Sequence, residues 1–121
     1  MVKALLDTNI LIDYLNGIPA AREELALYEE MAISIITWME VMAGAPPLAA
    51  RATREFLDRF ALMAINERVA ERAVPLRQQF RLKPPDAIIW ATAQVHAMLL
   101  VTRDTKIFPA DNPGVRMPYT V

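Results

Sequence analysis

The sequence predicts an α/β fold in which a mainly parallel sheet of four to five strands is flanked by helices. Four short apolar runs do not alternate with polar residues, as expected for strands buried on both faces; they lie at 2–6, 32–35, 61–65 and 99–101. Helical segments separate these runs, and their lengths suit the right-handed crossovers of a parallel sheet. The 121 residues have room for one domain, 1–121, with one core.

Helices are expected in the intervals between these strands. Asp7-Thr8-Asn9 supplies helix-starting residues after the first strand, and Asn16-Gly17 ends that short helix. Pro19 suits a first helical position, and a second helix is expected over 20–31. Pro75 should kink or divide its helix, because proline lacks a backbone N–H. The remaining helices are expected at 38–43, 48–60, 67–81 and 87–98, with a short last strand at 115–117.

The composition excludes several kinds of chemistry. Cysteine is absent and His96 is the only histidine, which excludes disulfides, thiolate sites and histidine-rich zinc centres. His96 itself is interpreted as a core or interface residue, because its predicted helix is apolar almost all round. No apolar run approaches the length of a membrane span, and no secretory signal precedes Asp7, so a cytoplasmic protein is expected. The 55% hydrophobic content predicts a covered self-association surface, and hence a homodimer.

Four carboxylates follow predicted strands or begin a predicted helix: Asp7, Glu40, Asp86 and Asp104. In an open α/β sheet the carboxyl ends of parallel strands point into the ligand-binding crevice, so these acids are expected to converge. Each acid also has a purely structural interpretation. Asp7 and Asp86 suit helix N-caps, Thr37 with Glu40 forms a capping-box pattern, and Asp104 suits an Asx-turn. Position alone leaves both interpretations open.

The residues around the four acids resemble the PIN-domain family, in its order and at about its spacing. The matching segments are Leu5–Asp13, Ile36–Val41, Pro85–Ala93 and Leu100–Asp104, followed by a family-like tail over Gly114–Tyr119. The resemblance covers nearly the whole chain, and it implies a PIN-like three-layer domain. The short length resembles the VapC-type toxin ribonucleases of toxin–antitoxin pairs.

This resemblance implies a metal centre formed by Asp7, Glu40, Asp86 and Asp104 as catalytic and metal-binding acids. It also implies supporting roles for Thr8, Asn9 and Thr102. Many relatives carry asparagine where Asp104 stands and an acid where Ile107 stands, whereas others carry the acid at the place of Asp104. Carboxylates packed together repel unless a cation neutralises them, and oxygen-only ligands favour Mg²⁺ or Mn²⁺.

The charge distribution suggests where RNA would bind. The net charge is −1, yet residues 51–83 carry seven arginines and one lysine against four acids. Arg68 and Arg72 lie four residues apart, a spacing that is mildly unfavourable on an isolated helix and that a phosphate backbone would favour. Arg103, beside Asp104, is a further candidate for a phosphate contact. The alternative for these arginines is ordinary solvated surface.

A soft apolar patch of Trp38, Met39 and Met42 lies beside Glu40 in the sequence. These side chains are expected either to pack in the core or to line a groove for a partner helix, as antitoxin segments do in the toxin pairs that the chain resembles.

Together these observations predict a metal-dependent endoribonuclease that hydrolyses RNA phosphodiester bonds, as the toxin of a type II toxin–antitoxin pair with a cognate antitoxin. Two other classes are kept. An aspartyl phosphotransferase also needs an acid after the first strand, but this chain lacks the second aspartate two residues beyond Asp7. A non-catalytic RNA- or partner-binding module would bind without cleavage and ignore a chelator.

Overall fold

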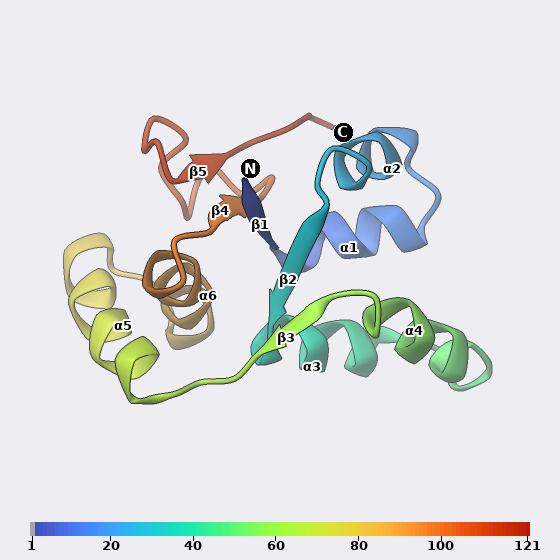
Figure 1. Cartoon of the computed structure of the whole chain (residues 1–121), viewed down its shortest axis with the longest axis horizontal. Helices are drawn as coiled ribbons and strands as arrows, with labels where there is room; N and C mark the ends of the chain where they lie inside the picture. The colour runs from blue at the N-terminus through green and yellow to red at the C-terminus, as the bar shows by residue number, and fades with distance from the viewer. Residues whose placement is uncertain (1) are drawn as a thin grey trace.

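A five-stranded, fully parallel sheet forms the centre of the computed structural model, which describes residues 2–121 (Figure 1). The strand order is β3-β2-β1-β4-β5, so the first strand lies in the middle. The strands are β1 (Lys3–Leu6), β2 (Glu30–Ser34), β3 (Ala61–Met63), β4 (Leu99–Val101) and β5 (Val115–Arg116). The predicted parallel sheet of four to five strands is confirmed.

Helices cover both faces of this sheet and produce three layers (Figure 1). They are α1 (Thr8–Leu15), α2 (Pro19–Leu25), α3 (Ile35–Gly44), the 3₁₀ turn η1 (Pro47–Ala49), α4 (Ala50–Leu57), α5 (Glu67–Phe80) and α6 (Pro84–Val95). Side chains alternate along each strand, so Leu5 and Leu100 pack with α5 and α6, whereas Leu6 and Val101 pack with α1, α3 and α4. No helix within residues 2–121 is long and apolar enough to cross a membrane.

The helix expected over 20–31 is much shorter, and that prediction is wrong at its C-terminal end. Helix α2 ends at Leu25, and the strand begins five residues later at Glu30. Glu30 and Met31 pair with Lys3 and Ala4 of β1. Pairing with the central strand therefore outweighs the local helical preference of this segment.

Helix α5 continues through Pro75, where a kink or a division was expected. The helix extends from Glu67 to Phe80 as one element, so the expected division is wrong. Pro75 is exposed, so water can hydrate the carbonyl group that loses its intrahelical partner. Arg81 then ends the helix in the left-handed conformation, with φ of 55°.

The strand order places a topological switch point between β1 and β4. From β1 the chain proceeds outward through β2 and β3, and then returns to the other side of β1 to form β4 and β5. The amide of Asp7 donates to the carbonyl of Val101 at 2.9 Å, so the two strand ends are held side by side. In open α/β sheets such a switch point opens a crevice at the carboxyl ends of the strands.

Candidate active site

Asp7 is the buried centre of the candidate site, because it lies directly at the end of β1. Its carboxylate is 6% exposed and accepts hydrogen bonds from the Thr8 amide at 2.8 Å and the Thr102 hydroxyl at 2.7 Å. The amide contact makes Asp7 the N-cap of α1, as one interpretation expected. The contact with Thr102, 95 residues away in the sequence, belongs to the switch point rather than to the helix. Asp7 thus caps a helix and also faces the crevice.

Glu40 reaches the site from the second turn of α3. Its Oε1 accepts a hydrogen bond from the Thr8 hydroxyl at 2.6 Å, and that hydroxyl also lies 3.1 Å from the hydroxyl of Thr37. The capping-box interpretation of Thr37 and Glu40 is wrong. Helix α3 begins at Ile35, and its N-cap is Ser34, whose hydroxyl accepts from the Ile36 amide at 3.1 Å.

Asp86 lies in the first turn of α6, but it is not the N-cap of that helix. The N-cap position is occupied by Lys83, and two prolines begin the helix before Asp86. Burial raises the pKa of Asp86, and the negative charges of Glu40 and Asp104 raise it further. Asp86 is therefore close enough to Glu40 and Asp104 to interact with their charges.

Asp104 belongs to the turn that follows β4. Its amide donates to the Thr102 hydroxyl at 3.0 Å, and its carbonyl accepts from the Phe108 amide at 3.0 Å. The side chain that closes this turn is therefore that of Thr102, whereas an Asx-turn of Asp104 was the alternative. Because the same Thr102 hydroxyl donates to Asp7, the turn that carries Asp104 lies beside Asp7, and the charge of Asp104 adds to the effect of burial on the pKa of Asp86.

The electrostatics of the four acids favour a cation. Burial raises the pKa of Asp7 to about 6, and the charges of Asp86 and Glu40 add to that effect, although hydrogen bonds from Thr102 and Thr8 oppose it. Within residues 2–121, no three His, Cys, Asp or Glu side chains lie close enough together to hold one metal ion, so the four acids would have to move together to bind one. The donors are all carboxylate or hydroxyl oxygens, so the set fits a hard divalent ion such as Mg²⁺ or Mn²⁺.

Thr8, Asn9 and Thr102 connect the acids to one another. Asn9 Nδ2 lies 3.4 Å from both the Asp7 carboxylate and the Thr102 hydroxyl. Asn9 Oδ1 accepts from the Arg103 amide at 3.2 Å, which ties α1 to the turn after β4. The three residues thus join the ends of β1 and β4 and α3 by hydrogen bonds, and their supporting roles stay a prediction.

The side chain of Arg103 points into an ion pair. Its Nε and Nη2 donate to the two oxygens of Asp13 at 2.5 and 3.1 Å, and the Tyr119 hydroxyl donates to the same carboxylate at 2.8 Å. Hydrogen bonding to Asp13 raises the pKa of Arg103. Sequence reasoning missed Asp13 and Tyr119. The sequence offered one signal for Asp13: it is an acid three residues after Ile10, on the same side of a short, mostly apolar helix.

Arg68 and Arg72 lie away from the acids. Arg72 Nε donates to Gln94 Oε1 at 2.5 Å, and Gln94 follows Asp86 by eight residues on α6. That separation is about 12 Å along a helix axis. The N-terminal half of α5 therefore lies toward the opposite edge of the sheet, and the structure does not bring Arg68 and Arg72 to the four acids.

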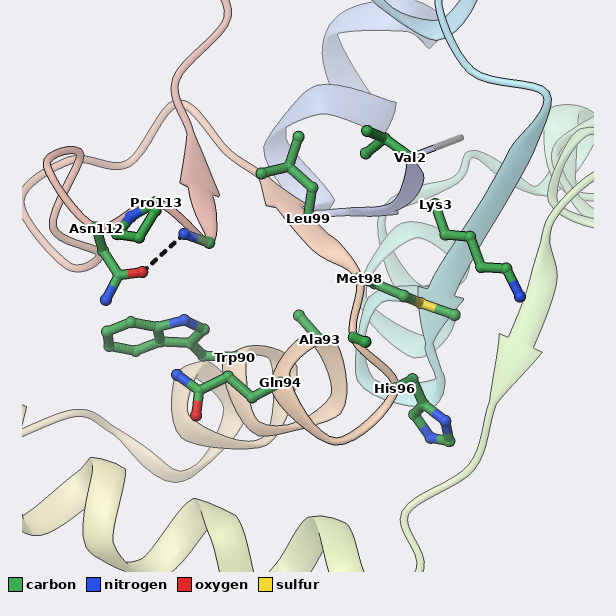
Figure 2. Close-up of a pocket in the computed structure, with 12 residues that line it drawn as sticks. Val2, Lys3, Trp90, Ala93, Gln94, His96, Met98, Leu99, Asn112 and Pro113 are labelled. Carbon is green, nitrogen blue, oxygen red and sulfur yellow. Dashed lines mark hydrogen bonds between the residues drawn. The ribbon is translucent and has the colours of Figure 1, made fainter.

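A cavity of about 750 Å³ also lies at that opposite edge, and Figure 2 shows its lining. His96 lines this cavity as the C-cap residue of α6 and is partly exposed, so the core alternative is wrong and the interface alternative stays a prediction. Trp90, nearly fully buried, forms another wall. None of the four acids lines this cavity, which lies at the other end of the strands.

A second apolar hollow, of about 450 Å³, lies between α1, α3 and α4. We call it the α1–α3 groove, and its apolar side chains are Ile12, Leu15, Val41, Ala45, Pro46, Ala49 and Ala52. Trp38 and Met42 pack partly against the core, and the Arg54 guanidinium lies 5.1 Å from the Trp38 ring centre. These two side chains thus pack as one alternative expected, and the groove is formed by other residues.

The sheet order, the switch point and the four acids define a PIN-type α/β domain, and a family comparison agrees. The PIN domain model matches residues 4–111, so the chain belongs to the PIN domain family. Among individual relatives, it is 31% identical to Ribonuclease VapC19 of Mycobacterium tuberculosis, over 95% of this chain and 98% of that protein.

Solved structures show the same similarity. A chain of a toxin–antitoxin complex from Klebsiella pneumoniae is 50% identical, with a TM-score of 0.93 over 98% of this chain and 100% of that one. A chain of FitAcB from Neisseria gonorrhoeae is 25% identical, with a TM-score of 0.80 over 98% and 99% of the two chains.

Proposed function

We propose that this protein is a metal-dependent endoribonuclease that hydrolyses RNA phosphodiester bonds, and that it is the toxin of a toxin–antitoxin pair. The observation that carries the proposal is the set of contacts at the switch point: the Thr102 hydroxyl donates to Asp7 and accepts from the Asp104 amide, and the Thr8 hydroxyl donates to Glu40. Burial raises the pKa of Asp86, and the charges of Glu40 and Asp104 raise it further, so Asp86 lies near the same place. The names of the relatives, a ribonuclease and a toxin–antitoxin complex, support the same activity.

The four acids would hold Mg²⁺ or Mn²⁺, which when bound lowers the pKa of a water molecule and stabilises charge on the leaving oxygen. Hydrogen bonds from the Thr8 amide and the Thr102 hydroxyl orient the Asp7 carboxylate, so it needs little reorganisation to bind a metal ion. Thr8 also orients Glu40 through a 2.6 Å hydrogen bond. Asp86 lies in the first turn of α6, where the helix dipole favours its charged form.

RNA is proposed to lie across the open edge of the sheet that carries the acids. Arg68 and Arg72 remain candidates only for a distant part of a long RNA, because Arg72 is bound to Gln94 near the far end of α6. Arg103 is engaged by Asp13, which leaves its guanidinium poorly placed for a phosphate. A phosphate contact near the acids is better supplied by Lys83, which is exposed and precedes Asp86 by three residues.

We propose the α1–α3 groove as the place where the antitoxin binds. The groove is apolar, and Leu48 beside it is fully exposed, so an uncovered toxin leaves a hydrophobic surface in water. An amphipathic partner segment would bury this surface by placing its apolar face in the groove. The similar chain from Klebsiella pneumoniae belongs to a toxin–antitoxin complex, which supports a partner of this kind.

A second apolar surface is proposed for homodimerisation. Ile65, Val74, Pro84 and Ile88 line a hollow of about 250 Å³ between α5 and the start of α6. Val74 is 56% exposed and Leu62 on the edge strand β3 is 50% exposed. A second copy would cover this face at a two-fold axis. A single domain over 1–121 and a cytoplasmic location also stay predictions.

The activity is tested by incubating RNA with the protein and Mg²⁺ or Mn²⁺, with Asp86→Asn as the inactive variant. We expect cleavage that stops on addition of a chelator and falls by at least about a hundredfold in Asp86→Asn, because one negative ligand is removed. Asp111→Asn, at an exposed aspartate of a distant loop, is the matched control and should cleave normally. Binding without cleavage, insensitive to chelator, would instead favour a non-catalytic module.

A further inference from the structure

Asp13 is a buried carboxylate that connects three separate segments of the chain. It lies on α1 with 6% of its surface exposed, and it holds the guanidinium of Arg103 through two parallel hydrogen bonds. It also accepts the hydroxyl of Tyr119, which lies in the segment after β5. A paired, bidentate geometry of this kind fixes an arginine more firmly than a single contact does.

The bond to Arg103 matters because Arg103 lies between two residues of the candidate metal centre. Thr102 donates to Asp7 at 2.7 Å, and its oxygen accepts from the amide of Asp104 at 3.0 Å. The amide of Arg103 donates to Asn9 at 3.2 Å. The backbone of this turn therefore faces the acids, while the Arg103 side chain points away from them toward Asp13.

The ion pair between Asp13 and Arg103 also affects the charge of the candidate site. A guanidinium next to Asp104 would attract the site carboxylates and compete with a divalent cation for them. In the ion pair, Asp13 neutralises that charge, and the Arg103 side chain is only 28% exposed. The four acids are thus left with their negative potential available to a metal ion.

We propose that Asp13 is a positioning residue of the metal centre: acting through Arg103, it holds the turn that carries Thr102 and Asp104 and keeps the arginine charge away from the site. The inference rests on the proposed function, since it assumes that the four acids bind a divalent cation. It assigns Arg103 to the protein scaffold, whereas the sequence suggested a phosphate contact.

The chain contains a second cluster of the same construction that provides a matched control. Glu24 is 4% exposed, and its carboxylate accepts hydrogen bonds from Arg116 Nε at 2.7 Å, Arg116 Nη2 at 2.9 Å and the Tyr28 hydroxyl at 2.6 Å. This cluster joins α2 to β5, and its acid contacts none of the four site carboxylates. Removing either buried acid charge should cost stability, because each leaves an arginine without its partner.

The experiment compares Asp13→Asn with Glu24→Gln by titrating Mn²⁺ calorimetrically into each folded protein, well below its melting temperature. We expect Asp13→Asn to weaken Mn²⁺ binding by roughly tenfold, the low end of what outer partners of metal ligands contribute. Glu24→Gln should bind Mn²⁺ within about twofold of the wild type. Cleavage by Asp13→Asn should recover at high Mn²⁺ with an unchanged KM for RNA, which a merely unstable variant would not show.

Tyr119→Phe, paired with Tyr28→Phe, repeats the comparison with a smaller change in case Asp13→Asn does not fold. Equal Mn²⁺ affinities within both pairs of variants, with a wild type that binds and cleaves, would overturn this inference and leave the proposed function intact. A wild type that binds no Mn²⁺ would overturn both. Arg103→Gln also separates the roles: a higher KM for RNA at unchanged Mn²⁺ affinity would show a phosphate contact and refute the positioning role.

Discussion

Replacing Asp7 with asparagine should abolish cleavage and yet make the metal-free protein more stable at neutral pH. The pKa of Asp7 is raised from 3.8 to about 6, first by burial and then by the charges of Asp86 and Glu40. A difference of about two pKa units corresponds to about 3 kcal/mol. This is the free energy that the folded protein loses by keeping an ionised carboxylate at this position.

The sign of the pH dependence follows from proton binding. Between pH 3.8 and about 6 the folded state holds the proton of Asp7 more often than the unfolded chain, so the free energy of unfolding falls as the pH rises through this window. Above pH 6 the full penalty is present. Asparagine has no charge to bury, so the variant should lack this component of the pH dependence.

Hydrogen bonding reduces the expected gain. Asparagine offers one oxygen, whereas Asp7 accepts from Thr8 with one oxygen and from Thr102 with the other. The loss of one of these bonds should cost about 1 kcal/mol. The net stabilisation at pH 7.5 should therefore be about 2 kcal/mol, and it should disappear near pH 4.

Urea unfolding in the presence of a chelator, at pH 7.5 and at pH 4.5, measures this difference directly. Asp111→Asn serves as the control, because it removes a carboxylate that is exposed rather than buried. A helix N-cap alone would give little change, since asparagine caps a helix about as well as aspartate. Unchanged or lower stability of Asp7→Asn at pH 7.5 would therefore refute the inference that the metal-free fold loses stability by burying an ionised Asp7 beside Asp86 and Glu40.

Two further predictions concern the apolar surfaces. Val74→Asp should convert the dimer into a monomer, because it places a charge on the proposed two-fold face, and light scattering at micromolar concentration would measure this. Val121→Asp, at another exposed valine, should leave the dimer unchanged. A monomeric wild type would contradict the proposed dimer. After co-expression with the adjacent reading frame, which would encode the antitoxin, Ala49→Glu in the α1–α3 groove should prevent the two proteins from co-purifying. Leu27→Glu, at an exposed leucine outside the groove, should have no effect. If Ala49→Glu still binds the antitoxin, the partner binds elsewhere.

Much of the architecture is predictable from local patterns. The uniform apolar runs around β1 and β4 are typical of strands buried on both faces, and each is found within a residue or two of its expected position. The boundary that was wrong between α2 and β2 depends on pairing across the sheet, whereas α3 and α6 each begin three residues earlier than expected, at Ile35 and Pro84. Glu30 and Met31 look helical in the sequence, but they join β2 because the backbone of Lys3 and Ala4 is available beside them.

In the candidate site, too, some features follow from local sequence patterns and others only from contacts between distant segments. Asp7 and Asp86 are recognisable because each lies beside a strand end or a helix start with a family-like context. The ion pair of Asp13 with Arg103 spans 90 residues, so no local pattern predicts it. Its existence depends on α1 and the turn after β4 meeting at the switch point.

By itself the sequence determined the class of fold and the order of its elements, because these depend on hydrophobic periodicity and on residues that are close in the chain. The four acids as metal ligands stay a prediction from the family resemblance. Only the tertiary structure decided how the acids interact, that Glu40 is oriented by Thr8 rather than by a capping box, and that Arg103 is held by Asp13. These are contacts between distant segments. They depend on how the β1 and β4 strand ends lie together, which no single segment encodes.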